Sequence, residues 1–244
     1  MIDRIYNEDC LEGMKRIPDG IVDAIICDPP FGITDAPFDK RLPFDPMWEQ
    51  FKRVTKHNAA IVLFSQMPFG AELIMSNRKM FRYEWIVEKK SAGGGFLNAK
   101  KMPLRSHENI LIFYRALPTY NPQWTFKKPY KAVPHSFSVN YANQKPTMQI
   151  SEDGRRYPRD VLRYTFPHKI HSQRKPVDLI EYLIKTYSNE GELVLDATIG
   201  SGTTAVACIK TGRHFIGFET EKKFCDIANE RIEKALAEKT AALF

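Results

Sequence analysis

The sequence has few cysteines and no long apolar run. Its four cysteines, Cys10, Cys27, Cys208 and Cys225, show no C-x-x-C spacing and no nearby histidine cluster. We therefore expect neither a metal site nor a disulfide framework. No apolar stretch approaches the roughly 18 residues of a membrane span, and charges fill the N-terminal positions where a signal peptide needs apolar residues. These absences predict a cytoplasmic protein.

Two common phosphate-binding fingerprints are also missing. The stretch "VLDATIGSGTT" contains the glycine loop Gly200, Ser201 and Gly202, but no G-K-[ST] follows, as a Walker loop requires. Ala205 takes the place of the third glycine of the dinucleotide pattern G-x-G-x-x-G. An NAD-type dehydrogenase is therefore a distant alternative.

The same loop still has the features of a nucleoside site. Asp196 closes a predicted strand, and Thr203 and Thr204 begin a predicted helix whose N-terminal amides are unpaired. Glu219 closes the next strand about 20 residues later, where an acid can bind a ribose diol. The plain structural alternative is a tight turn followed by an exposed glutamate. We interpret the two motifs as a site for a nucleoside that does not depend on a pyrophosphate.

The chain as a whole alternates between strand-like and helix-like segments. The predicted strands are 3–6, 24–27, 59–65, 83–90, 108–115, 192–196 and 213–221, and the predicted helices are 11–16, 47–56, 69–77, 175–188, 203–212 and 222–236. This order predicts an α/β protein with a mostly parallel sheet. The loop 32–46 reads as a mobile segment, and residues 89–107 form a second loop rich in glycine and lysine.

Positive charge gathers in one part of the chain. The net charge is +7, but residues 115–175 hold twelve basic and three acidic residues, so the remainder is slightly acidic. Within this part, residues 116–167 are rich in proline, lack hydrophobic periodicity and mix aromatic with basic residues. We place an inserted region there and expect a polyanionic partner, although a solvated face or a small irregular core has the same composition. The candidate DNA contacts are Lys127, Lys128, Lys131, Arg155, Arg156 and Arg159.

The stretch "VDAIICDPPFG", residues 22–32, raises the question of an active site. An apolar strand ends in Asp28, Pro29, Pro30 and Phe31. Proline cannot continue a central strand, and Asp, Pro and Gly form turns, so a simple strand end is a sufficient reading on its own.

Four motifs together resemble the S-adenosylmethionine-dependent amino-methyltransferases of DNA. "DPPF" at 28–31 resembles their D-P-P-[YF] tetrad, and "LDATIGSGTT" at 195–204 resembles their cofactor loop, commonly D-P-F-x-G-S-G-T-T. "HSQRKP" at 171–176 resembles their H-x-x-x-K-P segment, and the opening residues 6–30 resemble the stretch in which an early acid reaches the cofactor adenine. The tetrad precedes the cofactor loop, as in the β-ordered group. The resemblance covers roughly residues 3–236.

The resemblance implies a fold, a cofactor and a set of residues. It implies a Rossmann-like methyltransferase fold with helices on both faces of the sheet, a circularly permuted motif order and target recognition by residues 116–167. Residues 1–115 and 168–244 would then form the catalytic domain. The implied cofactor is S-adenosylmethionine and the implied partner is double-stranded DNA. Its implied cofactor-binding residues are Asp9, Cys10, Asp28, Lys175, Asp196, Gly200, Ser201, Gly202, Thr203, Thr204 and Glu219.

The chemistry of the tetrad fits this interpretation. An exocyclic amine is a poor nucleophile, and acceptors for its hydrogens localise its lone pair. Asp28 and the Pro29 carbonyl supply such acceptors, and neither proline contributes an N–H. Phe31 would stack on a base flipped out of the duplex.

Two departures and several alternatives stay open. Phe31 stands where Tyr is commoner, and Ala197 and Thr198 stand where Pro and Phe are usual, which thins a hydrophobic wall beside the cofactor. An aspartate in the tetrad usually accompanies adenine, so Asp28 favours adenine-N6 over cytosine-N4 methylation. A catalytically silent DNA-binding subunit is an alternative of another class. The resemblance is compatible with a homodimer, a cognate restriction endonuclease, and a bacterial or phage origin.

Overall fold

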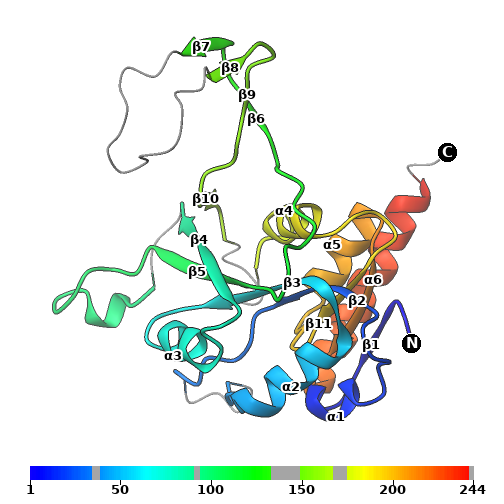
Figure 1. Ribbon diagram of the computed structural model, residues 1–244. Coiled ribbons are helices and arrows are strands. Elements are labelled where there is room, and N and C mark those ends of the chain that lie inside the picture. The colour runs from blue at the N-terminus through cyan, green and yellow to red at the C-terminus, as the bar shows by residue number, and fades with distance from the viewer. Residues whose placement is uncertain (35–38, 91–93, 133–148, 167–174, 242–244) are drawn as a thin grey trace. The chain divides into compact units, whose positions relative to one another are not determined.

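The computed structural model describes residues 1–34, 39–90, 94–132, 149–166 and 175–241 (Figure 1). The chain forms two compact units, the first made of Met1–Asn121 and Asp160–Phe244 and the second of Pro122–Arg159. The second unit lies within residues 116–167, where the sequence predicts an inserted region. Among the described residues, no helix is long and apolar enough to cross a bilayer, and no three or more His, Cys, Asp and Glu side chains gather as a metal site.

An eight-stranded sheet forms the centre of the first unit, in the order β1-β12-β11-β2-β3-β5-β4-β10. Its strands are β1 (Arg4–Tyr6), β2 (Val22–Cys27), β3 (Thr55–Ser65), β4 (Phe81–Lys89), β5 (His107–Phe113), β10 (Val161–Tyr164), β11 (Leu193–Asp196) and β12 (His214–Phe218). Every neighbouring pair is parallel except the two that β5 makes with β3 and β4. The predicted α/β fold with a mostly parallel sheet is confirmed.

Helices cover both faces of this sheet. They are α1 (Cys10–Met14), α2 (Phe44–Val54), α3 (Phe69–Ser76), α4 (Val177–Tyr187), α5 (Thr203–Thr211) and α6 (Lys222–Ala241). Successive strand residues point to opposite faces, so Ile25 and Cys27 join one apolar cluster while Ile26 joins the other. The first cluster packs against α1, α2 and α3, and the second against α4, α5 and α6. Nearly all of β2 is therefore apolar, as the sequence shows.

The predicted element types are correct, and the ends differ at informative places. Helix α2 begins at Phe44, three residues before the expected start, with Pro43 at its N-cap. Thr55 and Lys56, expected in that helix, begin β3 instead. Helix α5 lies between Gly202 and Gly212, both with positive φ, so the glycines fix both of its ends.

The sequence pattern does not predict strand β10. Residues Val161–Tyr164 lie within the predicted insertion, yet they pair in parallel with Ile86–Lys89 of β4 at the edge of the main sheet. Their alternating exposed and half-buried pattern is that of an edge strand rather than a central one.

The second unit consists of two small antiparallel pairs. Strand β6 (Thr125–Phe126) pairs with β9 (Arg155–Arg156), and β7 (Tyr130–Ala132) pairs with β8 (Gln149–Ser151). Gly154 has φ +78°, and a Cβ there would lie 2.0 Å from the Lys127 carbonyl oxygen. The tight approach of these two segments therefore requires glycine.

Parallel pairing brings the candidate site together. Strands β1, β12, β11 and β2 all end at the same edge of the sheet, so the residues that follow them in the chain are neighbours in space. Because β5 runs the other way, its first residues lie at this edge too. The site is therefore built from chain segments near residues 9, 28, 108, 198 and 219.

Candidate active site

Asp28 follows β2 directly and lies beside a buried lysine. Its Oδ2 is 2.7 Å from Lys175 Nζ, and the Lys175 side chain is only 10% exposed. Its other oxygen, Oδ1, is buried and has no hydrogen-bond partner among the described residues. A buried acceptor without a donor is costly unless something fills the place. Asp28 thus offers one free acceptor, held in place by an ion pair.

Lys175 continues into a chain of alternating charges. Its Nζ lies 3.1 Å from Glu108 Oε2, and Glu108 Oε1 lies 2.5 Å from Lys89 Nζ. Glu108 is the second residue of β5 and Lys89 the last of β4. Lys175 was predicted to bind the cofactor, whereas its contacts in the structure are with two carboxylates.

Burial and pairing set the ionisation of these groups. Burial raises the pKa of the Asp28 carboxyl and Glu108 adds to this rise, and although the Lys175 ammonium lowers that pKa, the net shift is upward. Burial also raises the pKa of Glu108, but Lys175 and Lys89 outweigh it and hold that pKa below its ordinary value. For Lys175, burial lowers the pKa, but the two carboxylates together raise it by more, so the net shift of the pKa is upward. Lys175 therefore stays charged and supports the charged form of Asp28.

The rest of the tetrad is packed in place. Pro29 is buried, and the Phe31 ring stacks on Phe69 with 5.1 Å between centroids and 30° between planes. After the tetrad, Asp39 accepts backbone N–H bonds from Gly32 and Ile33, at 2.8 and 2.9 Å. Part of the loop 32–46, predicted as mobile, is thus tied back to itself, and residues 35–38 lie outside the described residues.

Thr198 connects the glycine loop to Asp28. Its hydroxyl lies 2.9 Å from the Asp28 carbonyl oxygen and 3.1 Å from Cys27 Sγ. A carbonyl can only accept, so the Thr198 hydroxyl donates to it and the Cys27 thiol donates to Thr198. Burial raises the pKa of Cys27, which keeps the S–H in place. The threonine that departs from the expected Phe therefore orients the first peptide of the tetrad.

Several residues predicted to bind the cofactor are used inside the protein. Asp196 accepts the Thr198 N–H at 3.1 Å and the Thr204 hydroxyl at 2.5 Å. Arg231 of α6 donates to the Ser201 carbonyl and to the Thr203 hydroxyl, the latter at 3.3 Å. These side chains therefore hold the glycine loop in shape through hydrogen bonds within the protein.

Gly200 and Glu219 border open space. Gly200 has φ +54°, and a Cβ built there meets, among the described residues, only Glu219 Oε2, at 4.0 Å. Gly202 differs, because its Cβ would lie 2.8 Å from that of Ala228, so this glycine permits close packing of α5 on α6. Burial raises the pKa of Glu219, which accepts the Glu221 N–H at 2.8 Å. The room beside Gly200 and the carboxylate next to it fit a nucleoside with a ribose diol.

Asp9 and Cys10 lie at the start of α1. Asp9 Oδ1 accepts the N–H groups of Leu11 and Glu12, at 2.8 and 3.2 Å, so Asp9 is the N-cap of this helix. The Cys10 side chain is 4% exposed and belongs to the core. The contact of Asp9 with the cofactor adenine and the cofactor-binding role of Cys10 stay predictions, and the helix cap uses Oδ1 of Asp9.

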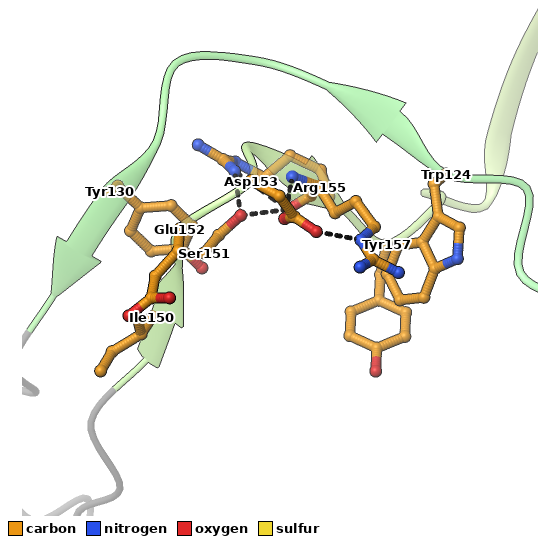
Figure 2. A pocket seen from close by; sticks show the side chains of 9 residues that line it. Trp124, Tyr130, Ile150, Ser151, Glu152, Asp153, Arg155 and Tyr157 are labelled. Carbon is orange, nitrogen blue, oxygen red and sulfur yellow. Dashed lines mark hydrogen bonds and ion pairs between the residues drawn. The ribbon is translucent and has the colours of Figure 1, made fainter.

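The second unit carries an aromatic and cationic hollow of about 630 Å³. Figure 2 shows the Trp124 and Tyr157 rings together at one end, and their centroids are 4.4 Å apart. Arg155 lies over Trp124 and is paired with Asp153. Arg156 is bonded internally, to the Lys128 carbonyl at 2.6 Å and the Ser151 hydroxyl at 3.0 Å.

The candidate DNA contacts therefore divide by exposure. Lys127, Lys128, Lys131, Arg155 and Arg159 are exposed, and Arg156 is half-buried. Arg156 holds β9 and the turn after β6 together, so its predicted role as a DNA contact is the weakest of the six.

The carboxyl edge of the mostly parallel sheet thus carries a glycine loop, a D-P-P-F tetrad and a free buried acceptor, the features expected of a methyltransferase. A family model described as DNA methylase, that of the N6 and N4 enzymes, matches residues 22–230. The match covers most of the chain, so the chain belongs to this family.

Bacterial enzymes and solved structures are similar over most of the chain. The type II methyltransferase M.HpaI of Haemophilus parainfluenzae is 27% identical in an alignment 251 positions long, gaps included, which covers 96% of this chain and 75% of that protein. M1.MboII of Moraxella bovis is 27% identical in an alignment 259 positions long, which covers 93% of this chain and 95% of that protein.

Two crystallised methyltransferases show the same fold. The complex of M1.HpyAVI with SAM aligns with a TM-score of 0.62 and 24% identity, over 93% of this chain and 98% of that one. The PvuII DNA methyltransferase, described as cytosine-N4-specific, aligns with a TM-score of 0.68 and 14% identity, over 93% and 85%.

The buried Asp196 gives a stability prediction. Burial raises its pKa to about 7, against the hydrogen bonds from Thr204 and Thr198, which lower it. The unfolded carboxyl titrates near 3.9, so the stability that neutral Asp196 provides is complete below about pH 4 and is lost as pH rises to about 7. We expect Asp196→Asn, which carries no charge, to gain stability relative to wild type as pH rises from 5 to 7. The gain should approach about 1.4 kcal/mol per pH unit.

Chemical unfolding at both pH values measures this difference. Asp226→Asn on the exposed side of α6 is the matched control and should show no such trend. A difference between Asp196→Asn and wild type that does not change with pH would contradict the prediction.

Proposed function

We propose that this enzyme is a sequence-specific DNA methyltransferase that acts on the N6 amine of adenine. The observation that carries the proposal is the free Asp28 Oδ1, buried at the end of β2 while Oδ2 is paired with Lys175. Aspartate at this place in the tetrad favours adenine. The family includes both N6 and N4 enzymes, so the choice of base is the point to test.

Asp28 would accept a hydrogen from the target amine. A carboxylate accepts without donating, and the Pro29 carbonyl next to it accepts as well, while Pro29 and Pro30 carry no N–H. The amine lone pair, otherwise delocalised into the ring, is then localised for attack. Because the Thr198 hydroxyl bonds the Asp28 carbonyl, the peptide joining Asp28 to Pro29 has a fixed orientation. Positioning of this kind lowers the activation free energy of a reaction by about several kcal/mol.

Phe31 would hold the extruded base. Phe69 covers the Phe31 ring by stacking at 5.1 Å, and Phe31 is only half-buried, so part of it remains accessible. Stacking of a base on an aromatic ring contributes about 1–3 kcal/mol. Bound S-adenosylmethionine would supply a methyl group attached to a sulfonium sulfur, which leaves as a neutral thioether when the methyl group is transferred. The amine becomes strongly acidic once alkylated, so Asp28 need not be a strong base.

The cofactor would lie along the edge formed by β1, β12 and β11. We assign the ribose to Glu219 and the close backbone approach to Gly200, because the space beside both is open. The second unit would recognise the target sequence through its exposed cations and the Trp124–Tyr157 pair. A homodimer and a companion restriction endonuclease remain predictions from the family resemblance.

Substitution of Asp28 tests the chemistry. We expect Asp28→Ala and Asp28→Asn to lower labelled-methyl transfer to unmethylated DNA by at least about 100-fold, because Ala removes the acceptor and Asn replaces the charged carboxylate with a neutral amide. Folding should persist, since Lys175 keeps its ion pair with Glu108.

Nucleoside analysis of the wild-type product identifies the base. N6-methyladenine is the expected product, and N4-methylcytosine would overturn the assignment of adenine. Wild-type protein that binds DNA but transfers no methyl group would instead support a silent binding subunit.

Lys175 should control the pH dependence. Lys175→Met removes the charge that lowers the pKa of Asp28, so that pKa rises. The acidic limb of the kcat/KM profile is then expected to move to higher pH. Lys175→Arg keeps the charge and should keep the wild-type limb. Circular dichroism confirms folding, and an unmoved limb in folded Lys175→Met would show that Asp28 ionisation does not depend on this lysine.

Tyr157 and Arg156 should separate recognition from folding in the second unit. Tyr157 is 72% exposed, and loss of a stacking ring in Tyr157→Ala should weaken DNA binding by about tenfold. Leu117→Ala, 78% exposed but in the first unit, is the matched control. Arg156→Ala should instead speed amide exchange in β6 and β9, because it loses two internal bonds. Unchanged DNA affinity in Tyr157→Ala would refute the assignment.

A further inference from the structure

The chain between β4 and β5 forms an exposed arm, residues 94–106 (Figure 1). Every side chain of the arm for which burial is described is exposed. Leu97 is 84% exposed, Met102 54% and Leu104 48%. Three large apolar side chains in one short solvent-facing segment exceed what a plain connecting loop needs.

The arm has a defined backbone. Gly94 and Arg105 exchange two backbone hydrogen bonds, of 2.8 and 2.9 Å, which close its base. Near its tip, the N–H groups of Lys101 and Met102 both bond to the Asn98 carbonyl, at 2.8 and 3.0 Å. The exposed side chains are thus presented from a hydrogen-bonded scaffold.

The charge of the arm has one sign. Lys100, Lys101 and Arg105 lie in it, and no acidic residue occurs between Glu88 and Glu108. A duplex carries one negative charge per about 1.7 Å of its axis, so this segment is complementary to DNA. A protein partner would have to supply several acids and an apolar patch at once.

The arm begins and ends at the active site. Lys89 precedes it and Glu108 follows it, and these residues pair with each other at 2.5 Å. Glu108 is 3.1 Å from Lys175, which is 2.7 Å from Asp28. A base extruded toward Asp28 stays joined to its duplex, so the duplex must pass close to this edge of the sheet.

We propose that residues 94–106 are a DNA-contacting arm that holds the duplex beside the extruded base. Lys100, Lys101 and Arg105 contact phosphates, and Leu97 and Met102 pack against the sugars and base edges that extrusion exposes. This inference rests on the proposed function. It adds a contact from the catalytic unit itself, outside the region assigned to target recognition.

The test compares two charge-matched variants in the full-length enzyme. Lys100→Gln/Lys101→Gln removes two arm cations. Arg78→Gln/Lys79→Gln removes two exposed cations from the segment before β4, at the opposite edge of the sheet. The DNA is a duplex that contains the sequence methylated by the wild-type enzyme. Its equilibrium binding is measured across salt concentrations with S-adenosylhomocysteine present.

The arm variant should lower the slope of log K against log salt by about 2, because each lost phosphate contact contributes about 0.9. The control variant should leave the slope unchanged. Leu97→Ala should weaken binding with no change of slope. S-adenosylmethionine binding should match wild type in all three variants.

The outcomes separate the two proposals. If wild type methylates DNA but the arm variant has the wild-type slope, the arm proposal is wrong and the proposed function stands. If wild type methylates no DNA, the proposed function fails first. A slope that falls equally in the control variant would also overturn the arm proposal, because any surface cation would then act alike.

Discussion

The proposed active site depends on one buried lysine shared by two carboxylates. Lys175 contacts Asp28 and Glu108, and Lys89 closes the far side of Glu108. In a low-dielectric interior, two cations and two anions in alternation leave no charge alone, whereas loss of one partner typically costs about 3–5 kcal/mol. The residues belong to the chain before α4 and to the ends of β2, β4 and β5. The ion-pair chain therefore forms only when all four segments are correctly placed.

This chain of charges explains how the proposed catalytic acceptor, Asp28, can be buried. A carboxylate with one oxygen out of water and unbonded would ordinarily take up a proton. Lys175 opposes that protonation, and the unpaired Oδ1 keeps its acceptor capacity for a substrate amine. The Thr198 hydroxyl orients the backbone beside it, and the thiol of Cys27 completes that hydroxyl's bonds. Lys175 thus controls the charge of Asp28, and Thr198 controls the orientation of its backbone.

The sequence could predict whatever depends on local pattern plus parallel pairing. Apolar runs followed by Asp28, Gly200 and Glu219 were enough to place these residues at one edge. Glu108 and Lys89 were missed, because each looks like an ordinary charge at a strand end. Their meeting requires β5 to run antiparallel between β3 and β4, which is a long-range property of the sheet. Asp196 was predicted to contact the cofactor, and only coordinates show that both of its oxygens are used within its own loop.

The two units differ in how their shape is maintained, and this difference bears on how such an enzyme could change its target. The first unit has two large apolar clusters, one on each face of its sheet, so substitutions there disturb a packed core. In the second unit, only Ser151 and Gly154 are buried among its described residues. Its shape relies on Arg156, the Asp153–Gly154 turn and two short strand pairs. Most of its side chains can therefore change with little cost in stability. Under the proposed role in target recognition, its aromatic and basic surface is free to vary while the ion-pair chain at Asp28 stays fixed.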